Sequence, residues 1–352
     1  MKKILFIYFI ERNLGIVDKA KKIEKGFSDE NCKVKVIGYV GRGRKIKRII
    51  QIIGFYLVSI FTITKIKYDI IFIRNSYYFI FIYIICLLMK KEIQVEINSK
   101  ESEEFSLKKM KIRKILAKIA LNIAVKCSSK VHTVTHELVD YYKKLFPEAF
   151  IIYNPNFVVD EYMVERKSNI HQNIKANIVF LGSTAQAWHG MDLFIKKVVV
   201  GNSWFLENCK LHIVGFCSAG FKSLIKEYDL RDIVVLHGYQ NGVSKKLIMN
   251  EMNVGVAGLN LKLKGLSEAT PIKVAEFLHA GLPIIIGYDD NRLKNGLPFI
   301  LKIGITNGKT VLQNKINEFI KTSQNNYDLI EQAQKYAKKN MMVNNYIKNI
   351  IT

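Results

Sequence analysis

Two scarcities, of cysteines and of long apolar runs, limit what this 352-residue chain can be. The five cysteines are an odd number without C-x-x-C spacing, which excludes a disulfide framework and a cysteine zinc site and favours a reducing compartment. No apolar run reaches the roughly 20 residues that a membrane-spanning helix needs. Hydrophobic residues at 49% and charged residues at 24% are ordinary fractions that exclude wholesale disorder. The length predicts two domains, each large enough for its own core.

Acidic residues are also scarce. The chain has 30 Asp and Glu and 54 Lys and Arg, which gives it a formal net charge of +24. Residues 1–160 contain 30 basic and 15 acidic side chains, so the excess is concentrated in the first half. Such a charge attracts nucleic acid, anionic lipid head groups or phosphorylated substrates. A codon bias toward Ile, Lys and Asn explains the same excess without any partner, so charge alone leaves these alternatives open.

Several catalytic signatures are missing. The chain has no D-x-D motif of the kind that holds a metal on a nucleotide sugar, and Asp289-Asp290 are adjacent and precede a turn. It has no G-x-S-x-G elbow, Walker loop or H-E-x-x-H motif. No metal and no other cofactor is therefore expected.

The first half alternates short apolar segments with stretches long enough for a helix, the β-α-β order of a parallel sheet. The opening residues lack the small-residue cleavage site of a signal peptide, so they predict a buried first strand. The strands expected here are 4–10, 33–38, 70–73, 93–97 and 131–134. Thr135 is expected to cap the helix that follows.

The pattern restarts after the polar residues 160–175, which are expected to be a linker. Five strands, each ending on or near a glycine, are expected at 178–181, 211–214, 233–236, 254–257 and 282–286. Ligands of such sheets bind beyond the carboxyl ends of the strands, so a site is expected at that edge.

Two apolar stretches, 49–64 and 77–89, each precede a strand and are predicted to be helices that cover the first sheet. Basic residues 42–48 precede the first, and residues 108–118 combine six cations with apolar residues at helical spacing. A basic segment beside an apolar helix is typical of a protein that lies on an anionic bilayer. Core helices with solvated basic ends explain the same residues, so both interpretations stay open.

Residues 268–283 are the most informative stretch. Pro271 stands where a helix can begin and Gly281 where it can end, which places Glu268 on the preceding loop and Glu276 inside the helix. The free amides and positive dipole end of a helix N-terminus suit a phosphate group. A sugar attached to a diphosphate would use all three features, since carboxylates accept hydrogen bonds from hydroxyls.

This stretch resembles the family-4 retaining glycosyltransferases with the GT-B fold, which carry a Glu-x7-Glu motif. Glu268 and Glu276 have that spacing. The continuation is matched by Pro271, Lys273, Ala280, Gly281 and Pro283. The resemblance is strong over residues 178–287 and weaker before them.

The resemblance implies an α/β protein of two Rossmann-like parallel-sheet domains that face a cleft. The acceptor-side domain would comprise residues 1–158, completed by a C-terminal helix at about 327–352. Residues 176–326 would form the nucleotide-sugar domain, and residues 159–175 the linker.

The resemblance also implies roles for residues. Glu276 would hold the ribose and Glu268 the donor sugar or its phosphate. Other nucleotide-side positions would be Gly15, Gly182, Ser183, Gly215 and the amides of Ala269, Thr270 and Ile272. The acceptor-side loop would include Glu96, Asn98, Glu103 and Glu104. Many family members carry cations where Ser183 and His189 stand, so Lys273, His189 or both are expected to act on the diphosphate.

The expected function is retaining transfer of a sugar from a nucleotide-diphosphate sugar to a hydroxyl of a lipid-linked or saccharide acceptor, in bacterial capsule or cell-surface polysaccharide synthesis. The expected location is the cytoplasm, peripheral on the inner face of the cell membrane. The alternatives are an isomerase similar to nucleotide-sugar 2-epimerases and a non-catalytic GT-B partner protein. Nucleic acid is not expected, because the basic segments lack aromatic platforms.

Overall fold

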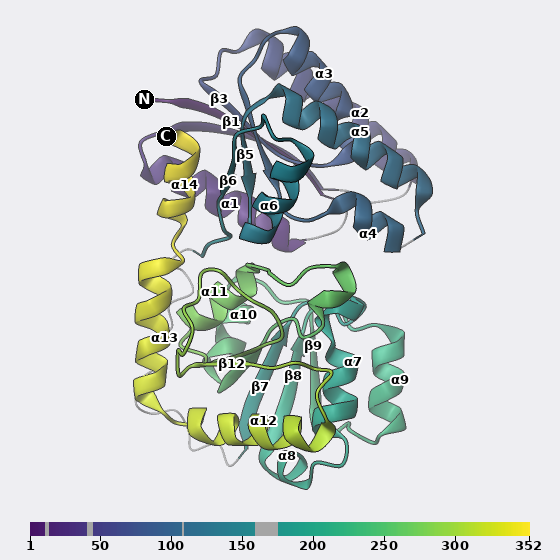
Figure 1. The fold of residues 1–352 in the computed structure, drawn as a ribbon, viewed down its shortest axis with the longest axis vertical. Helices are drawn as coiled ribbons and strands as arrows, with labels where there is room; N and C mark the ends of the chain where they lie inside the picture. The colour runs from purple at the N-terminus through teal and green to yellow at the C-terminus, as the bar shows by residue number, and fades with distance from the viewer. Residues whose placement is uncertain (11–13, 41–44, 108, 159–174) are drawn as a thin grey trace. The chain divides into compact units, whose positions relative to one another are not determined.

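The computed structural model describes residues 1–352 except 11–13, 41–44, 108 and 159–174. The expected linker and the basic residues Arg42 and Arg44 therefore lie outside the described residues. Contacts within the chain divide it into two compact units (Figure 1). Unit 1 comprises residues 1–155 and 343–352, and unit 2 comprises residues 156–342.

Unit 1 is built on a six-stranded parallel sheet in the order β2-β1-β3-β4-β5-β6. Its strands are β1 Lys3–Ile10, β2 Lys33–Val40, β3 Ile70–Arg74, β4 Ile93–Ile97, β5 Ser128–Thr133 and β6 Ile151–Tyr153. Helices cover both faces of such a sheet, which explains the nearly continuous Ile, Val and Phe runs. The five strands expected from the sequence are confirmed, and the three-residue β6 was missed because it is too short to show a pattern.

The unit 1 helices are α1 Leu14–Asp29, α2 Lys45–Lys65, η1 Tyr77–Phe79, α3 Ile80–Leu88, α4 Glu101–Leu107, α5 Lys111–Cys127, α6 His136–Leu145 and α14 Val343–Ile351. In the strand order, β2 lies on one side of β1, and β3 to β6 follow on the other side. Because connections between parallel strands are right-handed, the helix between β1 and β2 lies on the opposite face of the sheet from the helices that follow β2. Helix α1 therefore lies on one face, where it packs with α14. Helices α2, α3 and α5 lie side by side on the other face (Figure 1). Thr135 caps α6 as expected, since its hydroxyl accepts a hydrogen bond from the amide of Leu138 at 3.2 Å.

Unit 2 repeats the design with the order β12-β11-β10-β7-β8-β9, again parallel throughout. Its strands are β7 Ala176–Leu181, β8 Cys209–Val214, β9 Val234–Gly238, β10 Val254–Val256, β11 Ile284–Ile286 and β12 Ile300–Lys302. The sheet has six strands rather than the five expected, because the half-exposed β12 carries no apolar pattern.

The unit 2 helices are η3 Ala187–His189, α7 Met191–Phe194, η4 Ile195–Val199, α8 Ser203–Asn208, α9 Ala219–Glu227, α10 Gly242–Asn250, η5 Leu261–Lys264, α11 Ile272–His279, α12 Lys309–Ser323 and α13 Tyr327–Asn340. Helix α11 begins after Pro271 and is followed by Gly281 at φ 71°, as expected.

The end of the chain forms two helices where the sequence suggested one. Helix α13 ends at Asn340 and packs on α11 in unit 2, whereas α14 packs on α1 in unit 1. The chain thus passes between the units at 342/343, later than the position of about 327 suggested for the returning helix. The limits drawn from the sequence stay predictions.

Candidate functional site

Two glycines bring the loops after β7 and β8 close together. Gly182 and Gly215 have φ angles of 137° and 140°, which side-chain-bearing residues rarely adopt. A Cβ atom on Gly215 would lie only 2.1 Å from the carbonyl oxygen of Gly182. Since β7 adjoins both β8 and β10, these loops lie at the point where the strand order reverses, and ligands of open α/β sheets bind there.

The side chains of Lys273 and His189 lie next to Gly182. A Cβ atom on Gly182 would lie 3.1 Å from Lys273 Nζ and 3.4 Å from His189 Cε1. The Nζ atom also lies 4.5 Å from the centroid of the Phe180 ring, which belongs to β7. The glycine therefore leaves room for a cation at the sheet edge.

Lys273 is a buried cation without a hydrogen-bond acceptor among the described residues. Burial lowers its pKa from 10.5 to about 7, an effect that the carboxylate of Glu276 partly offsets. A buried charge without a partner is costly, so an anion at this position would stabilise the ammonium form.

His189 is uncharged at neutral pH. Burial, reinforced by the charge of Lys273, lowers its pKa to about 3. Its Nδ1 atom lies 2.7 Å from the carbonyl oxygen of Ser183, so Nδ1 carries the proton and donates it. The Nε2 atom is then a hydrogen-bond acceptor, suited to a hydroxyl rather than to a phosphate. The Ser183 hydroxyl accepts a hydrogen bond from the amide of Ala185 at 3.2 Å.

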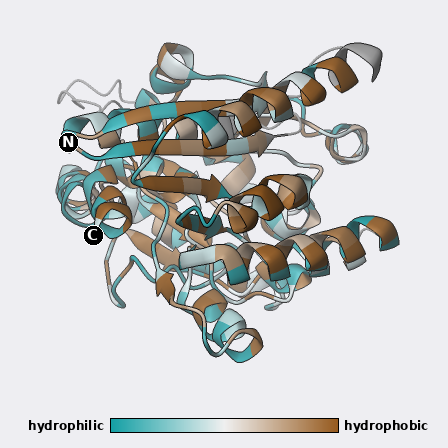
Figure 2. Ribbon diagram, turned by 90° about the horizontal axis from the view of Figure 1, so that it is seen from above, coloured by the Kyte–Doolittle hydropathy of each residue, from teal (hydrophilic) through white to brown (hydrophobic). Residues whose placement is uncertain are grey.

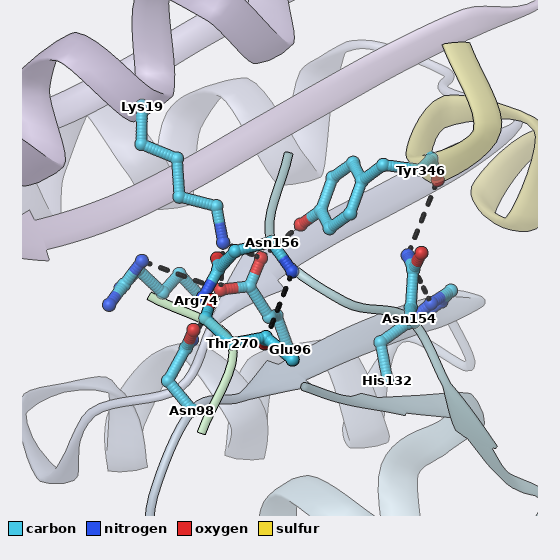
Figure 3. A network of polar contacts seen from close by, with 9 residues as sticks. All are labelled: Lys19, Arg74, Glu96, Asn98, His132, Asn154, Asn156, Thr270 and Tyr346. Atoms are coloured by element: carbon cyan, nitrogen blue, oxygen red, sulfur yellow. Dashed lines mark hydrogen bonds and ion pairs between the residues drawn. The ribbon is translucent and has the colours of Figure 1, made fainter. Parts of the chain in front are cut away.

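The N-terminus of α11 carries Lys273 in its first turn. The amides of Ile272 and Lys273 have no acceptor within the helix, because the first four amides of any α-helix lack one. Thr270 precedes this turn and is buried, and its carbonyl oxygen accepts a hydrogen bond from Asn156 Nδ2 at 2.8 Å (Figure 3).

A buried ion pair fixes the start of α11. Arg292 pairs with Asp290, donating from Nε to Oδ1 at 2.8 Å. Its remaining donors reach the carbonyl oxygens of Asn156 at 2.9 Å and Pro271 at 3.0 Å. Sequence reasoning missed this clamp, since a D-x-R in a polar turn has no distinguishing pattern.

Glu268 is half-buried on the loop before α11, where it forms an isolated β-bridge with Asp289. The amide of Ala269 donates to the carbonyl oxygen of Asp289 at 2.9 Å. Of the three amides expected to bind a diphosphate, that of Ala269 is therefore already engaged.

Glu276 lies on α11 with its carboxylate nearly buried. Its Oε1 atom is 3.0 Å from the Nζ atom of Lys245 on α10. Lys245 is a partner that sequence reasoning missed, because no spacing rule connects the two helices. The pair fixes the position of the carboxylate on which ribose recognition would depend.

The expected acceptor residue Glu96 is the centre of a buried network in unit 1 (Figure 3). Its carboxylate pairs with Lys19 at 2.7 Å and Arg74 at 3.4 Å, and accepts hydrogen bonds from Asn98 and Tyr346. Burial would raise its pKa, but the charges of Lys19 and Arg74, together with the hydrogen bonds from Lys19 and Tyr346, lower it to about 2. Four donors already surround this carboxylate, so its part in acceptor binding stays a prediction.

Other unit 1 positions lie on α4 and α1. Glu103 accepts a hydrogen bond from the hydroxyl of Tyr141 at 2.8 Å, and Glu104 is half-buried on the same helix. Glu101, missed in the sequence, is half-buried, and burial together with the charge of Glu104 raises its pKa to about 7. Gly15 lies in the first turn of α1, directly after residues outside the description.

In the described part of the chain, no group of three or more His, Cys, Asp or Glu side chains could hold a metal ion. No described helix is long and apolar enough to cross a membrane.

Comparison with known proteins rests on structure, since neither a family model nor a curated protein matches the sequence. Sucrose-phosphate synthase from Thermosynechococcus elongatus superposes with a TM-score of 0.71 at 10% identity, over 99% of this chain and 97% of that one. WaaG, a glycosyltransferase involved in lipopolysaccharide biosynthesis, gives 0.70 at 13% identity over 99% of both chains. The chain has the GT-B fold.

Anabaena Alr3699/HepE, solved in complex with UDP and glucose, is a further GT-B neighbour. It gives a TM-score of 0.69 at 14% identity, over 100% of this chain and 98% of that one. Identities this low establish the GT-B fold and leave the reaction to be argued from the residues.

Proposed function

We propose that the protein is a retaining glycosyltransferase, similar to family 4, that uses a nucleotide-diphosphate sugar as donor. The observation that carries the proposal is the buried Lys273 ammonium, which lies in the first turn of α11 beside Gly182 and has no hydrogen-bond acceptor among the described residues. A diphosphate would supply the missing anion. The UDP in the HepE complex supports a nucleotide donor in this fold.

The reaction breaks the bond between the sugar C1 and the diphosphate oxygen, which keeps the electron pair. The acceptor oxygen forms the new bond to C1 on the same face, and its proton passes to the departing diphosphate. Lys273 and the first amides of α11 would stabilise the charge that develops on the leaving group. Little further chemistry is required of the protein beyond holding the reactants in position.

The carboxylates and His189 would orient the donor. Glu276, fixed by Lys245, would accept hydrogen bonds from the ribose hydroxyls. Glu268 would bind the donor sugar, and His189 Nε2 would accept from one of its hydroxyls, because Nδ1 donates to Ser183.

The acceptor we propose is a lipid-linked saccharide of bacterial capsule or cell-surface polysaccharide synthesis, reached from the cytoplasmic face of the membrane. The resemblance to family 4 and the excess of cations in residues 1–160 support this assignment. The carboxylates that would meet it lie on α4, the helix after β4: Glu103, Glu104 and the half-buried Glu101.

Thermal-shift screening against UDP, GDP, dTDP and CMP tests the donor, because a ligand of the folded state raises Tm by mass action. One nucleoside diphosphate should raise Tm well above the others. The matching nucleotide sugar should then release its diphosphate only when an acceptor is present.

Each failure has a distinct meaning. Conversion of the donor without an acceptor would indicate an isomerase, the first alternative. If no nucleotide raised Tm, the site would not be a donor site, and a non-catalytic partner role would replace this proposal.

A further inference from the structure

One helical layer of unit 1 presents an apolar surface that the proposed transfer reaction does not explain. It consists of α2, α3 and α5, which lie side by side on one face of the sheet. Large apolar side chains that are 36–77% exposed follow all three helices: Ile49, Ile50, Ile53, Leu57, Val58 and Phe61 on α2; Phe81, Ile84, Leu87 and Leu88 on α3; Ile112, Ile115 and Ile119 on α5. We call this set the apolar face. Its helices carry long brown stretches in Figure 2.

The spacing shows that the apolar face points away from the sheet. On α3, Phe81, Ile84 and Leu88 recur at helical intervals, whereas Ile82, Tyr83 and Cys86 between them are fully buried. A helix that is apolar all round belongs in a protein core or in contact with lipid. Here the outer half of the helix is exposed.

The charged residues of these three helices are all of one sign. The sequences of α2, α3 and α5 contain no Asp or Glu and nine Lys or Arg, four on α2 and five on α5. On α5, the cations Lys111, Lys114 and Lys118 form a stripe beside that of Ile112, Ile115 and Ile119, because both sets recur at the same helical spacing. An apolar stripe flanked only by cations is the pattern of a helix in a bilayer interface.

The three helices are packed against one another. Helix α5 packs on α3, and Ala117, Ala120 and Ala124 form the buried side of α5. The hydroxyl of Tyr56 on α2 donates to the carbonyl oxygen of Tyr78 in η1, and its ring meets Phe81 on α3 edge-on at 6.4 Å. The apolar face is thus presented by three neighbouring helices.

We propose that the apolar face docks unit 1 onto an anionic lipid bilayer. Phe61, Phe81, Leu88 and Ile112 enter the interface between head groups and acyl chains, and Lys111, Lys114 and Lys118 contact the lipid phosphates. The proposal goes beyond the sugar transfer and does not depend on it. A protein partner would need an acidic rim around an apolar centre to match this face. An anionic bilayer presents negatively charged head groups above apolar acyl chains over its whole surface.

Flotation of the full chain with vesicles tests this docking. One set of vesicles contains phosphatidylcholine alone, and the other is mixed with phosphatidylglycerol. The wild-type protein should float with the anionic vesicles and dissociate as salt is raised. Lys111→Gln, Lys114→Gln and Lys118→Gln together should lower partitioning roughly a hundredfold, since each surface cation adds a factor of about five.

The apolar half of the proposal needs its own variant. Phe61→Ser, Phe81→Ser, Leu88→Ser and Ile112→Ser together should lower partitioning roughly tenfold or more, because less apolar area leaves water. Two unit 2 variants match these changes in number and kind at exposed positions. One combines Val243→Ser, Leu247→Ser, Leu263→Ser and Val311→Ser, and the other combines Lys222→Gln, Lys338→Gln and Lys339→Gln. Both controls should float like the wild type.

Three results would overturn the docking. The wild type could fail to float with anionic vesicles, the unit 2 controls could lose flotation equally, or the apolar variant could instead convert a dimer to a monomer in sedimentation. The last would assign the apolar face to a second copy of the chain. The same variants should keep the nucleotide-induced Tm shift of the wild type, because nucleotide binding is proposed to depend on Lys273 in unit 2. A failure of membrane docking can therefore be told apart from a failure of the proposed transfer reaction.

Discussion

Each unit contains a buried lysine close to the sheet edge, and the two lysines have opposite surroundings. Lys19 in unit 1 lies 2.7 Å from Glu96, and although burial lowers its pKa, the carboxylate opposes this and holds the value near 8. Lys273 in unit 2 has no such acceptor in the part of the chain that the structure describes, and burial lowers its pKa to about 7. Removing one partner of a buried ion pair leaves an uncompensated charge in the core, whereas a buried lysine without an acceptor is the place where we propose that an anion binds.

Breaking the unit 1 pair should produce the largest effect. Glu96→Ala leaves the buried Lys19 charge beside Arg74 without compensation, so the free energy of unfolding should fall by about 3–5 kcal/mol. The two tryptophans, Trp188 and Trp204, lie in unit 2. Circular dichroism should therefore show an earlier unit 1 transition in urea, while tryptophan fluorescence keeps its midpoint.

The control for that variant is Glu331→Ala, which removes an exposed pair with Lys335 on α13. Its cost should stay below about 0.5 kcal/mol, as is usual for exposed helix pairs. Equal losses in the two variants would show that the buried pair of Glu96 with Lys19 does not stabilise unit 1 more than an exposed pair does.

Glu268 should affect turnover rather than stability. Glu268→Gln removes a charge next to the proposed donor sugar, and turnover should fall about a hundredfold, as when one preorganised contact is lost. Calorimetry should show unchanged nucleoside diphosphate affinity. Glu251→Gln, at an exposed position, serves as the control, and a normal rate for Glu268→Gln would reduce Glu268 to a loop-stabilising residue.

Lys273 should behave in the opposite way to Glu96. Lys273→Met should weaken nucleoside diphosphate binding by about 1.5–3 kcal/mol, the contribution of a charge-assisted contact. The unliganded variant should be as stable as the wild type or more so, because an unpaired buried charge is gone. Lys262→Met removes an exposed lysine nearby and should change neither quantity. A clear loss of stability in Lys273→Met would contradict the comparison with Lys19.

The two lysines also mark what the sequence could predict. Apolar periodicity and glycine-ended strands located both sheets, and the Glu268 to Pro283 stretch located helix α11, because these signals are local. The sequence could not predict the network around Glu96, because its partners Lys19 and Tyr346 come from the distant helices α1 and α14. The ion pairs of Lys245 and Arg292 could not be predicted for the same reason, because the fold decides which side chains of different elements meet.

The low pKa of Lys273 gives the smallest but most specific effect. In the free protein burial lowers this pKa to about 7, so above pH 7 the amine is increasingly neutral. A bound diphosphate raises the pKa, so binding at pH 8 should take up a proton, and affinity should fall about fivefold from pH 7 to pH 8.

Stability should change in the other direction over the same range. An unfolded lysine keeps its proton up to pH 10.5, so between pH 7 and 10.5 the unfolded state binds more protons than the free folded protein. The free energy of unfolding should therefore rise with pH while nucleotide affinity falls. Calorimetry at pH 8 in two buffers of different ionisation enthalpy measures the uptake directly, and Lys273→Met should abolish the difference between the buffers. Equal binding enthalpies for the wild type would mean that Lys273 does not gain a proton from the ligand, and the diphosphate would have to be assigned to other groups.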